Sequence, residues 1–206
     1  GAQRGEKIAD VCAGRGAKSW SLAATGAHVT AVDVSADKLR QATRLVEQSG
    51  NALAATIAAD LRRAGAGQLS PLAGSFDRVL VDAPCTGLGT VRRRPEIRHR
   101  RRAADILAAA QLQRQILPNA ARLVAPGGLL LYAVCSMTAE EGAGTIGRFL
   151  ASHPQFEREP ASLDWLVSAL DSRGDLRTHP LWRGADAFYA ARLRRQPSSS
   201  AKRPIC

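Results

Sequence analysis

Apolar and polar residues follow two different spacings along this chain. Nearly continuous apolar and β-branched runs predict buried strands over 7–12, 28–33, 52–58, 76–81 and 129–134. Apolar positions at helical spacing predict helices over 17–24, 36–48 (with Ser35 as N-cap) and 103–124. Pro118 predicts a kink or a break in the last helix, and the run Pro126-Gly127-Gly128 is expected to end it.

The remaining segments complete a sheet of alternating strands and helices. Thr138 followed by Glu141 resembles a capping box for a helix that reaches Leu150, and 156–159 and 188–193 are expected to pair as closing strands. Strands that are apolar throughout predict an α/β fold with a doubly wound, mostly parallel sheet. The 206 residues fit one domain, which we place at 1–195, and the Ser, Pro and Lys content of 196–206 predicts a disordered tail.

The first strand runs into a glycine-containing turn, DVCAGRGAKS at 10–19. A dinucleotide fingerprint fails there because Ser19 stands where its third glycine belongs. A phosphate-binding P-loop fails because Cys12 and Ala17 occupy its glycine positions. The looser glycine turn of enzymes that use S-adenosylmethionine remains, and NAD stays a disfavoured alternative.

Two acids follow the next two predicted strands. Asp33 ends the second strand at about the spacing of an acid that holds ribose hydroxyls, and Asp60 follows the third, where it would meet an adenine edge. Ligands of doubly wound sheets bind beyond the carboxyl ends of the strands. A role as loop or capping acids is the alternative for both.

Two cysteines follow the fourth and fifth predicted strands, in Asp82-Ala83-Pro84-Cys85 and in Tyr132-Ala133-Val134-Cys135-Ser136. Strands in these positions are usually neighbours, so we expect both thiols to face one pocket. Burial as small apolar side chains is the alternative. One chemistry that would use such a set is methylation of cytosine at C5. A thiolate that adds to C6 makes C5 nucleophilic toward a methyl sulfonium, an acid near N3 stabilises the adduct, and a base removes the C5 proton.

The charge balance favours a polyanionic partner. Lys and Arg number 29 against 18 Asp and Glu, a net charge of +11. Such a surplus is typical of nucleic-acid binding, although a solvated basic surface is the alternative. The stretch after the fourth strand holds seven arginines, at 92, 93, 94, 98, 100, 101 and 102, and we expect Arg92, Arg93 and Arg94 to contact RNA phosphates.

Other classes are disfavoured by what the sequence contains. No apolar run is long enough to cross a membrane, so no membrane association is expected. Four separated cysteines without a CxxC pair, and histidines without zinc-ligand spacing, predict free thiols, no metal site and a reducing, cytoplasmic location. The first strand starts almost at the first residue, so we expect that an N-terminal portion is absent. A monomer is favoured, although the sequence does not fix the oligomeric state.

These motifs resemble the Sun/Fmu family of RNA cytosine-C5 methyltransferases over nearly the whole chain. The family patterns D-A-P-C-S-G-x-G and Y-A/S-T-C-S correspond to DAPCTGLG and YAVCS. R-R-x-P-D/E-I corresponds to 92–97, D-G-F-F-x-A-x-L to 186–193, and the cofactor loop D-x-C-A-A-P-G-G-K-T to DVCAGRGAKS. The resemblance implies the class I methyltransferase (Rossmann-like) fold, S-adenosylmethionine as cofactor and RNA as substrate, with 16S ribosomal RNA favoured over transfer RNA.

The resemblance also implies residue roles. Cys135 would be the nucleophile toward C6, Cys85 would assist proton removal and product release, and Asp82 would contact the cytosine beside the cofactor. The cofactor would be held by Cys12, Ala13, Gly14, Arg15, Gly16, Ala17, Lys18, Asp33, Asp60 and Asp82.

The chain departs from the family pattern at two places. Gly14, Arg15 and Ala17 replace alanine, proline and glycine in the loop, and Val134 replaces threonine beside the nucleophile. In DNA cytosine-C5 enzymes the nucleophile is the cysteine after proline, here Cys85, which is a rival assignment. A further alternative is an RNA-binding module of the same fold with weak or no catalysis.

Overall fold

The computed structural model describes residues 1–63, 67–161 and 164–197. Eight strands in this part of the chain form one sheet. Most of the tail that the sequence predicts to be disordered lies outside the described residues, which end at Pro197. The strands are β1 (Lys7–Val11), β2 (His28–Asp33), β3 (Ala55–Ala58), β4 (Phe76–Asp82), β5 (Val124–Val134), β6 (Phe156–Arg158), β7 (Leu176–Arg177) and β8 (Tyr189–Arg195).

The order of the sheet is β3-β2-β1-β4-β5-β8-β6, and β7 pairs with β8. β1 to β5 run parallel, and β8 is antiparallel to β5 and β6. The expected adjacency of the fourth and fifth strands and the closing strand pair are thereby confirmed. So is the doubly wound α/β fold, because the strand order reverses its direction between β1 and β4 in the middle of the sheet.

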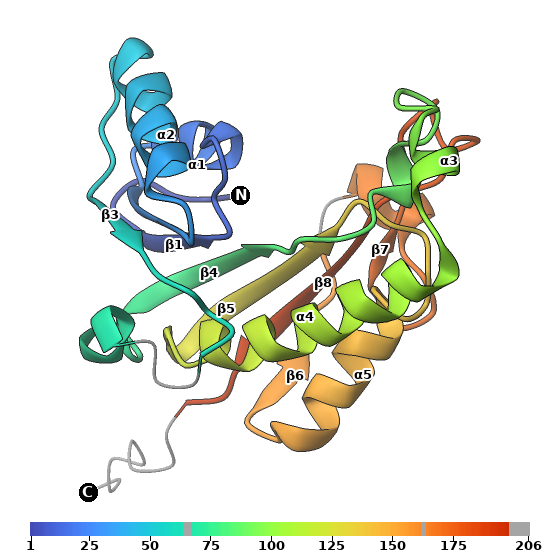
Figure 1. The fold of residues 1–206 in the computed structure, drawn as a ribbon. Coiled ribbons are helices and arrows are strands. Elements are labelled where there is room, and N and C mark those ends of the chain that lie inside the picture. Colours follow the sequence, from blue (N-terminus) through green and yellow to red (C-terminus); the bar gives the residue numbers. More distant parts are fainter. Residues whose placement is uncertain (64–66, 162–163, 198–206) are drawn as a thin grey trace, which may run out of the picture.

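Helices cover both faces of the sheet (Figure 1). α1 (Ala17–Ala23) and α2 (Ala36–Gln48) lie on one face, whereas α4 (Ala103–Ala121) and α5 (Ala143–Ser152) lie on the other. α3 (Ile97–Arg100) stands at the end of the sheet to which the parallel strands run. Short 3-10 turns occupy Gly67–Leu72, Leu88–Thr90 and Asp164–Ala169.

The hydrophobic core lies on the central strands β1, β4 and β5. Val79, Val81, Leu130, Tyr132 and Val134 are fully buried. Parallel strands with helices on both faces bury side chains on both faces, which explains why these strands are almost wholly apolar in sequence. The apolar runs therefore fix where the strands end, and with them the site described below.

Three sequence predictions about local structure are wrong. Pro118 lies inside one helix, so the predicted break is wrong, whereas the kink stays a prediction; α4 ends at Ala121 rather than at 124. Its neighbours Ile116 and Leu117 are buried, so packing against the sheet compensates for the hydrogen bond that proline removes. The Pro126-Gly127-Gly128 run lies within β5, at a register shift relative to β4.

The expected capping box is the third wrong prediction. α5 begins at Ala143, and its N-cap residue, Gly142, has no side-chain hydrogen bond to the helix. The carboxylate of Glu141 instead binds groups beside the two cysteines, as described below.

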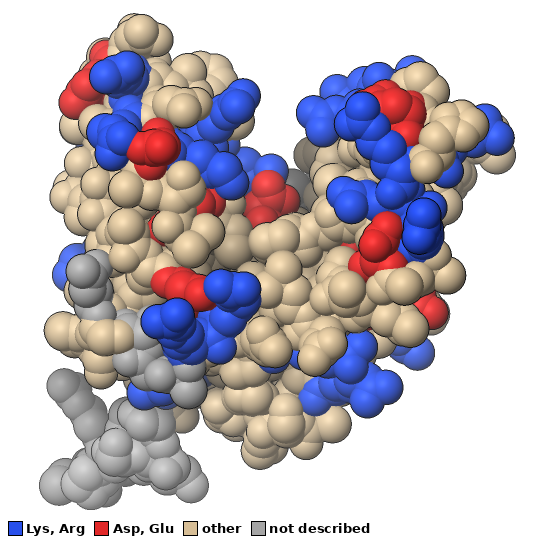
Figure 2. All heavy atoms as spheres, viewed as in Figure 1, with Lys and Arg blue, Asp and Glu red and all other residues tan. Residues whose placement is uncertain are grey.

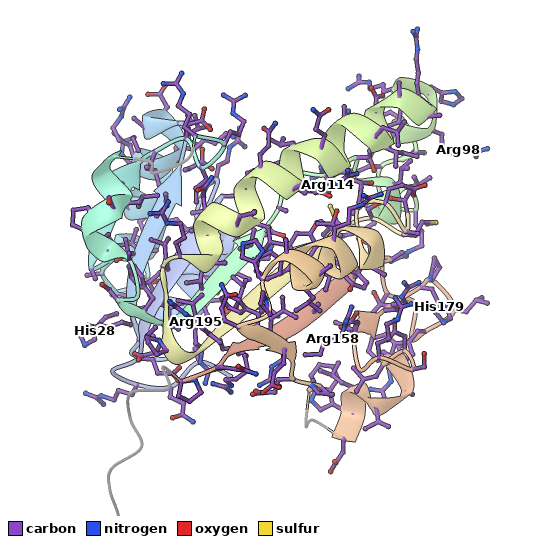
Figure 3. All side chains as sticks on the ribbon, turned by 90° about the horizontal axis from the view of Figure 1, so that it is seen from below. His28, Arg98, Arg114, Arg158, His179 and Arg195 are labelled. Atoms are coloured by element: carbon purple, nitrogen blue, oxygen red, sulfur yellow. The ribbon has the colours of Figure 1, made fainter. Side chains whose placement is uncertain are left out.

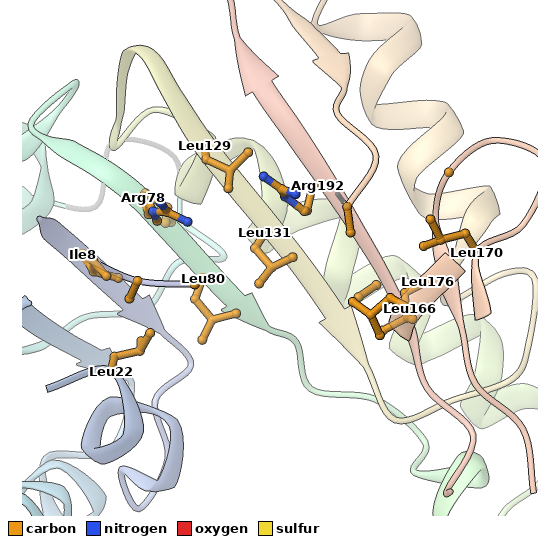
Figure 4. A pocket seen from close by; sticks show the side chains of 16 residues that line it. Ile8, Leu22, Arg78, Leu80, Leu129, Leu131, Leu166, Leu170, Leu176 and Arg192 are labelled. Carbon is orange, nitrogen blue, oxygen red and sulfur yellow. The ribbon is translucent and has the colours of Figure 1, made fainter. Parts of the chain in front are cut away.

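An apolar cavity of about 360 Å³ lies on the face of the sheet that α1 covers (Figure 4). Leu80 and Leu131 form its floor from β4 and β5, and Leu22 of α1 lies at one side. Among the described residues, no helix has the length and apolar character that a membrane crossing requires.

Candidate active site

The loop after β1 is built around the carboxylate of Asp33. The backbone N–H of Gly14 donates to Asp33 Oδ2 at 2.9 Å, and that of Ser35 donates to Oδ1 at 2.9 Å. One side chain therefore joins the turn after β1 to the start of α2. Both bonds fix the orientation of the carboxylate at the mouth of the site.

Glycine at position 16 is required by packing. Its φ of +85° is left-handed, and a Cβ there would lie 2.5 Å from Cβ of Ala42 on α2. The absence of a side chain at Gly16 therefore allows the start of α1 to pack closely against α2. The neighbouring Arg15 is exposed and does not line the two cavities at the carboxyl ends of the strands, so its side chain does not occupy either of them.

A buried acid lies beneath the loop. Asp10 is fully buried, and Ser19 Oγ donates to its Oδ2 at 2.5 Å, whereas Oδ1 has no partner in the described part of the chain. Burial, together with the nearby charge of Asp82, raises the pKa of Asp10 to about 6, against the opposing effects of Ser19 and Lys18.

A cavity of about 860 Å³ opens at the carboxyl ends of the parallel strands. It is lined by five of the residues expected to hold the cofactor, namely Cys12, Gly14, Lys18, Asp33 and Asp82, and by both cysteines of the strand ends. Ala13, Arg15, Gly16 and Ala17 are not among its lining residues, although they form the loop. The structure thus brings the predicted cofactor loop and the thiols to one cavity.

Asp60 lies apart from this set. It lines a smaller neighbouring cavity of about 260 Å³, which shares Cys12, Asp33 and Lys38 with the larger one. The guanidinium of Arg62 binds the Asp60 carboxylate, with an N–O distance of 2.6 Å, and lowers the pKa of that carboxyl to about 2. An adenine edge would meet Asp60 only beside this ion pair.

The two thiols are in direct contact. Cys85 Sγ lies 3.2 Å from Cys135 Sγ, within hydrogen-bonding distance for sulfur. A hydrogen bond from Cys85 lowers the pKa of Cys135 to about 7, in spite of partial burial and the nearby charge of Asp82. The same contact, together with burial, raises the pKa of Cys85. The lowered pKa favours Cys135 as the thiolate and Cys85 as the donor of the hydrogen bond between the two sulfurs.

Lys18 and Asp82 form the charged wall next to the thiols. Lys18 Nζ lies 2.5 Å from Asp82 Oδ2, which joins α1 to the end of β4. Lys18 also favours the thiolate of Cys135, whereas Asp82 opposes it. Cys12 differs from the other two thiols, because burial and the charges of Asp33 and Asp10 raise its pKa to about 12.

The three arginines expected to contact RNA have different environments. Arg93 forms an ion pair with the buried Asp186, with an Nε–Oδ2 distance of 2.6 Å. Arg92 donates to the carbonyl of Gly184 at 2.9 Å. Arg94 lines the large cavity, and its side chain has no hydrogen-bond or ion-pair partner within the described ranges. Arg92 and Arg93 therefore hold two loops together, and Arg94 is available to a ligand.

Basic side chains stand on both walls of the hollow between the α2 and α3 parts of the molecule (Figure 2). Lys38 lines it from α2, and Arg94, Arg100 and Arg101 line it from the other side. Figure 3 shows Arg98 far from His28 and Arg195, which lie at the other end of their strands. The arginine-rich segment is thus at the edge that carries the thiols.

Sequence reasoning missed two residues of this site. Phe188 lines the cavity beside the thiols and contributes an aromatic ring to it. Glu141 is fully buried and accepts hydrogen bonds from Thr86 and Ser136, the residues that directly follow the two cysteines. The ending D-A-F-Y was visible as a motif without a role, whereas the Thr-x-x-Glu spacing pointed to a helix cap.

A family model described as 16S rRNA methyltransferase RsmB/F matches residues 1–194. The chain is 38% identical over 205 residues to the ribosomal RNA small subunit methyltransferase B of Thermus thermophilus, covering 97% of this chain and 47% of that protein. It thus spans less than half the length of that relative.

Two solved structures have the same fold. The crystal structure of PH0851 superimposes with a TM-score of 0.83 at 34% identity, over 93% of this chain and 43% of that one. The structure of NSun6 from Pyrococcus horikoshii with SFG gives 0.80 at 25% identity, over 94% of this chain and 48% of that one.

Proposed function

Because this chain belongs to the 16S rRNA methyltransferase RsmB/F family, we propose that it transfers a methyl group from S-adenosylmethionine to C5 of a cytosine in RNA. 16S ribosomal RNA is the favoured substrate, since the Thermus relative is named for the small subunit. The observation that carries the proposal is the contact of two thiols, 3.2 Å apart, in a cavity that also holds the cofactor loop.

The residues of the cavity fit S-adenosylmethionine. The carboxylates of Asp33 and Asp82 line it close to the glycine turn, and Asp10 is buried below. Carboxylates suit the ribose hydroxyls and the positive sulfonium and ammonium groups of this cofactor, whereas the pyrophosphate of NAD would be repelled. When bound, the cofactor supplies an electrophilic methyl group.

Cys135 would begin the reaction as a thiolate. Its Sγ adds to C6 of the cytosine, and the electron pair of the C5–C6 bond makes C5 the nucleophile that accepts the methyl group. Asp82, at the end of β4, would hydrogen-bond the ring near N3 and stabilise the adduct. The low pKa of Cys135, about 7, provides a substantial thiolate fraction at neutral pH.

Cys85 would act after methyl transfer. The C5 proton must leave so that its electron pair can re-form the C5–C6 double bond and expel Cys135 as a thiolate. Cys85 lies next to the Cys135 sulfur and would assist this step, either in moving the proton or in donating a hydrogen bond to the departing sulfur. Both cysteines return to their starting state, and the products are 5-methylcytosine, a proton and the demethylated cofactor.

The cytosine must leave its base stack to reach the thiols. Phe188 lines the cavity and offers a surface for the ring, and Arg94 and Arg100 stand nearby without ion-pair partners in the described residues. Contacts from these arginines to phosphates would add affinity but little sequence information. Selection of the cytosine would then depend on RNA shape and on contacts outside this cavity.

The direct test is the identity of the methylated nucleoside. Small-subunit ribosomal RNA is incubated with the protein and methyl-labelled S-adenosylmethionine, and the RNA is digested to nucleosides for mass spectrometry. We expect label in 5-methylcytidine with the natural protein and none with Cys135→Ala. Label in another nucleoside, or undiminished label with Cys135→Ala, would refute the proposed reaction.

A further inference from the structure

We propose that Glu141 is a positioning residue that holds the Cys85 and Cys135 loops together so that the two sulfurs stay in contact. The role in methyl transfer rests on the proposed function, but the positioning of the sulfurs does not. Glu141 is fully buried in the turn between β5 and α5 and does not itself line the cavity, although it contacts Thr86, which does. Its effect would be exerted through the residues beside the thiols.

Five donors converge on the Glu141 carboxylate. Oε1 accepts from the backbone N–H of Thr86 at 2.8 Å and from Gln113 Nε2 at 3.3 Å. Oε2 accepts from the hydroxyls of Thr86 and Ser136, both at 2.6 Å, and from that of Thr138 at 3.1 Å. All five donors are neutral, and no Lys, Arg or His pairs with Glu141 among the described residues.

The donors flank the two thiols along the chain. Thr86 follows Cys85, and Ser136 follows Cys135. Gln113 of α4 donates to Glu141 and also, at 2.9 Å, to the carbonyl of Pro84, so Cys85 is held from both sides. One carboxylate therefore connects two loops that come from different strands.

The main chain of Glu141 adds a further connection. The hydroxyl of Tyr132, three residues before Cys135, donates to the Glu141 carbonyl at 2.6 Å. The side chain does not cap α5, because no side-chain bond caps the start of that helix. The bonds of the carboxylate go to the thiol loops, which is the arrangement expected of a positioning group rather than of a helix cap.

Glutamine at position 141 would preserve the volume but not the bonds. A carboxylate offers about four lone-pair sites, whereas an amide offers two on its single oxygen and adds two N–H donors. With its oxygen kept toward the N–H groups of Thr86 and Gln113, the glutamine amide would turn two N–H donors toward three hydroxyls. The hydroxyls would have to accept instead of donate, and one of the three would lose its partner. The loops would separate, and the hydrogen bond between the sulfurs would weaken.

The sign of the effect on Cys135 distinguishes positioning from bare charge. Loss of the bond from Cys85 raises the pKa of Cys135, because that bond is the main cause of its low value. Removal of a nearby negative charge would lower it. The other groups that face Cys135 are Asp82, Lys18 and Arg93, and they are unchanged in the variant.

The experiment measures the rate of Cys135 alkylation by iodoacetamide from pH 5 to 10, followed by mass spectrometry of the Cys135 peptide. It needs neither cofactor nor RNA, so it remains informative even if the methyltransferase proposal fails. The variant is Glu141→Gln. The matched control is Glu140→Gln, which makes the same chemical change at the exposed neighbouring residue.

We expect Glu141→Gln to move the midpoint of the profile upward by about one pH unit, toward the ordinary thiol value near 8.5. Glu140→Gln should leave it in place. An unchanged or lowered midpoint in folded Glu141→Gln would overturn the proposal. If Glu141→Gln does not fold, Ser136→Ala removes one bond to the Glu141 carboxylate, and an unchanged midpoint in that variant would overturn the proposal equally.

Discussion

Asp10 gives the sharpest test of the electrostatics beneath the site. It is fully buried at the end of β1 with one unpartnered oxygen, and burial raises its pKa from 3.8 to about 6. At 1.36 kcal/mol per pKa unit, ionised Asp10 lowers the free energy of unfolding by about 3 kcal/mol. The perturbation that removes this cost is Asp10→Asn.

The cost depends on pH in a defined direction. Because folding raises the pKa, the native state binds more protons than the unfolded state, and stability falls as pH rises through the interval from 3.8 to about 6. The linkage relation gives a cost of about 1.6 kcal/mol at pH 5 and about 3 kcal/mol at pH 8. Relative to the natural protein, Asp10→Asn should therefore gain about 1.4 kcal/mol between these two pH values.

Urea denaturation at pH 5, 6, 7 and 8 measures this difference. Asparagine keeps an acceptor for the Ser19 hydroxyl, and an unpartnered amide N–H would cost about 1–3 kcal/mol at every pH. Such a constant cost cancels when the pH values are compared. Asp37→Asn, at an exposed acid on α2, controls for the change in net charge. A stability difference that stays constant from pH 5 to pH 8 would refute the raised pKa of Asp10.

Two further predictions follow from the loop and from the arginine segment. Gly16→Ala should lower the free energy of unfolding by about 2–5 kcal/mol, since the costs of a left-handed φ and of a clash with Ala42 add together. Gly14→Ala should cost only about 1–2 kcal/mol, because a Cβ at position 14 meets open space. Equal losses of the two variants in urea denaturation would contradict this packing. Arg94→Ala should reduce the slope of log affinity against log salt for RNA by about 0.7–0.9 in filter binding and leave the urea midpoint unchanged. Arg93→Ala should lower that midpoint, because Asp186 loses the shorter of its two ion pairs. An unchanged salt slope with Arg94→Ala would contradict the assignment.

The sheet and its functional edge could be predicted because the signals are local. Val79 to Val81 and Leu129 to Val134 are apolar throughout, and a buried parallel strand leaves the next polar residues at its carboxyl end. Asp33, Asp82 and both cysteines could therefore be assigned to one edge before any contact was known.

What could not be predicted depends on contacts between distant residues. Arg93 and its partner Asp186 are 93 residues apart in sequence, so the run of arginines gave no sign that two of its members are structural. Thr138 and Glu141 have the same spacing in a capping box and in the thiol network, and only the position of Thr86 decides between them. The break predicted at Pro118 is absent, because packing stabilises the helix that contains it.

The central claim is that Cys135 attacks the base and that Cys85 releases it. The measurement is the amount of protein–RNA adduct that survives denaturing gel electrophoresis after incubation with unmodified RNA and S-adenosylmethionine. We predict that Cys85→Ala accumulates this adduct and that Cys135→Ala forms none. An adduct that accumulates in Cys135→Ala and is missing in Cys85→Ala would contradict the account.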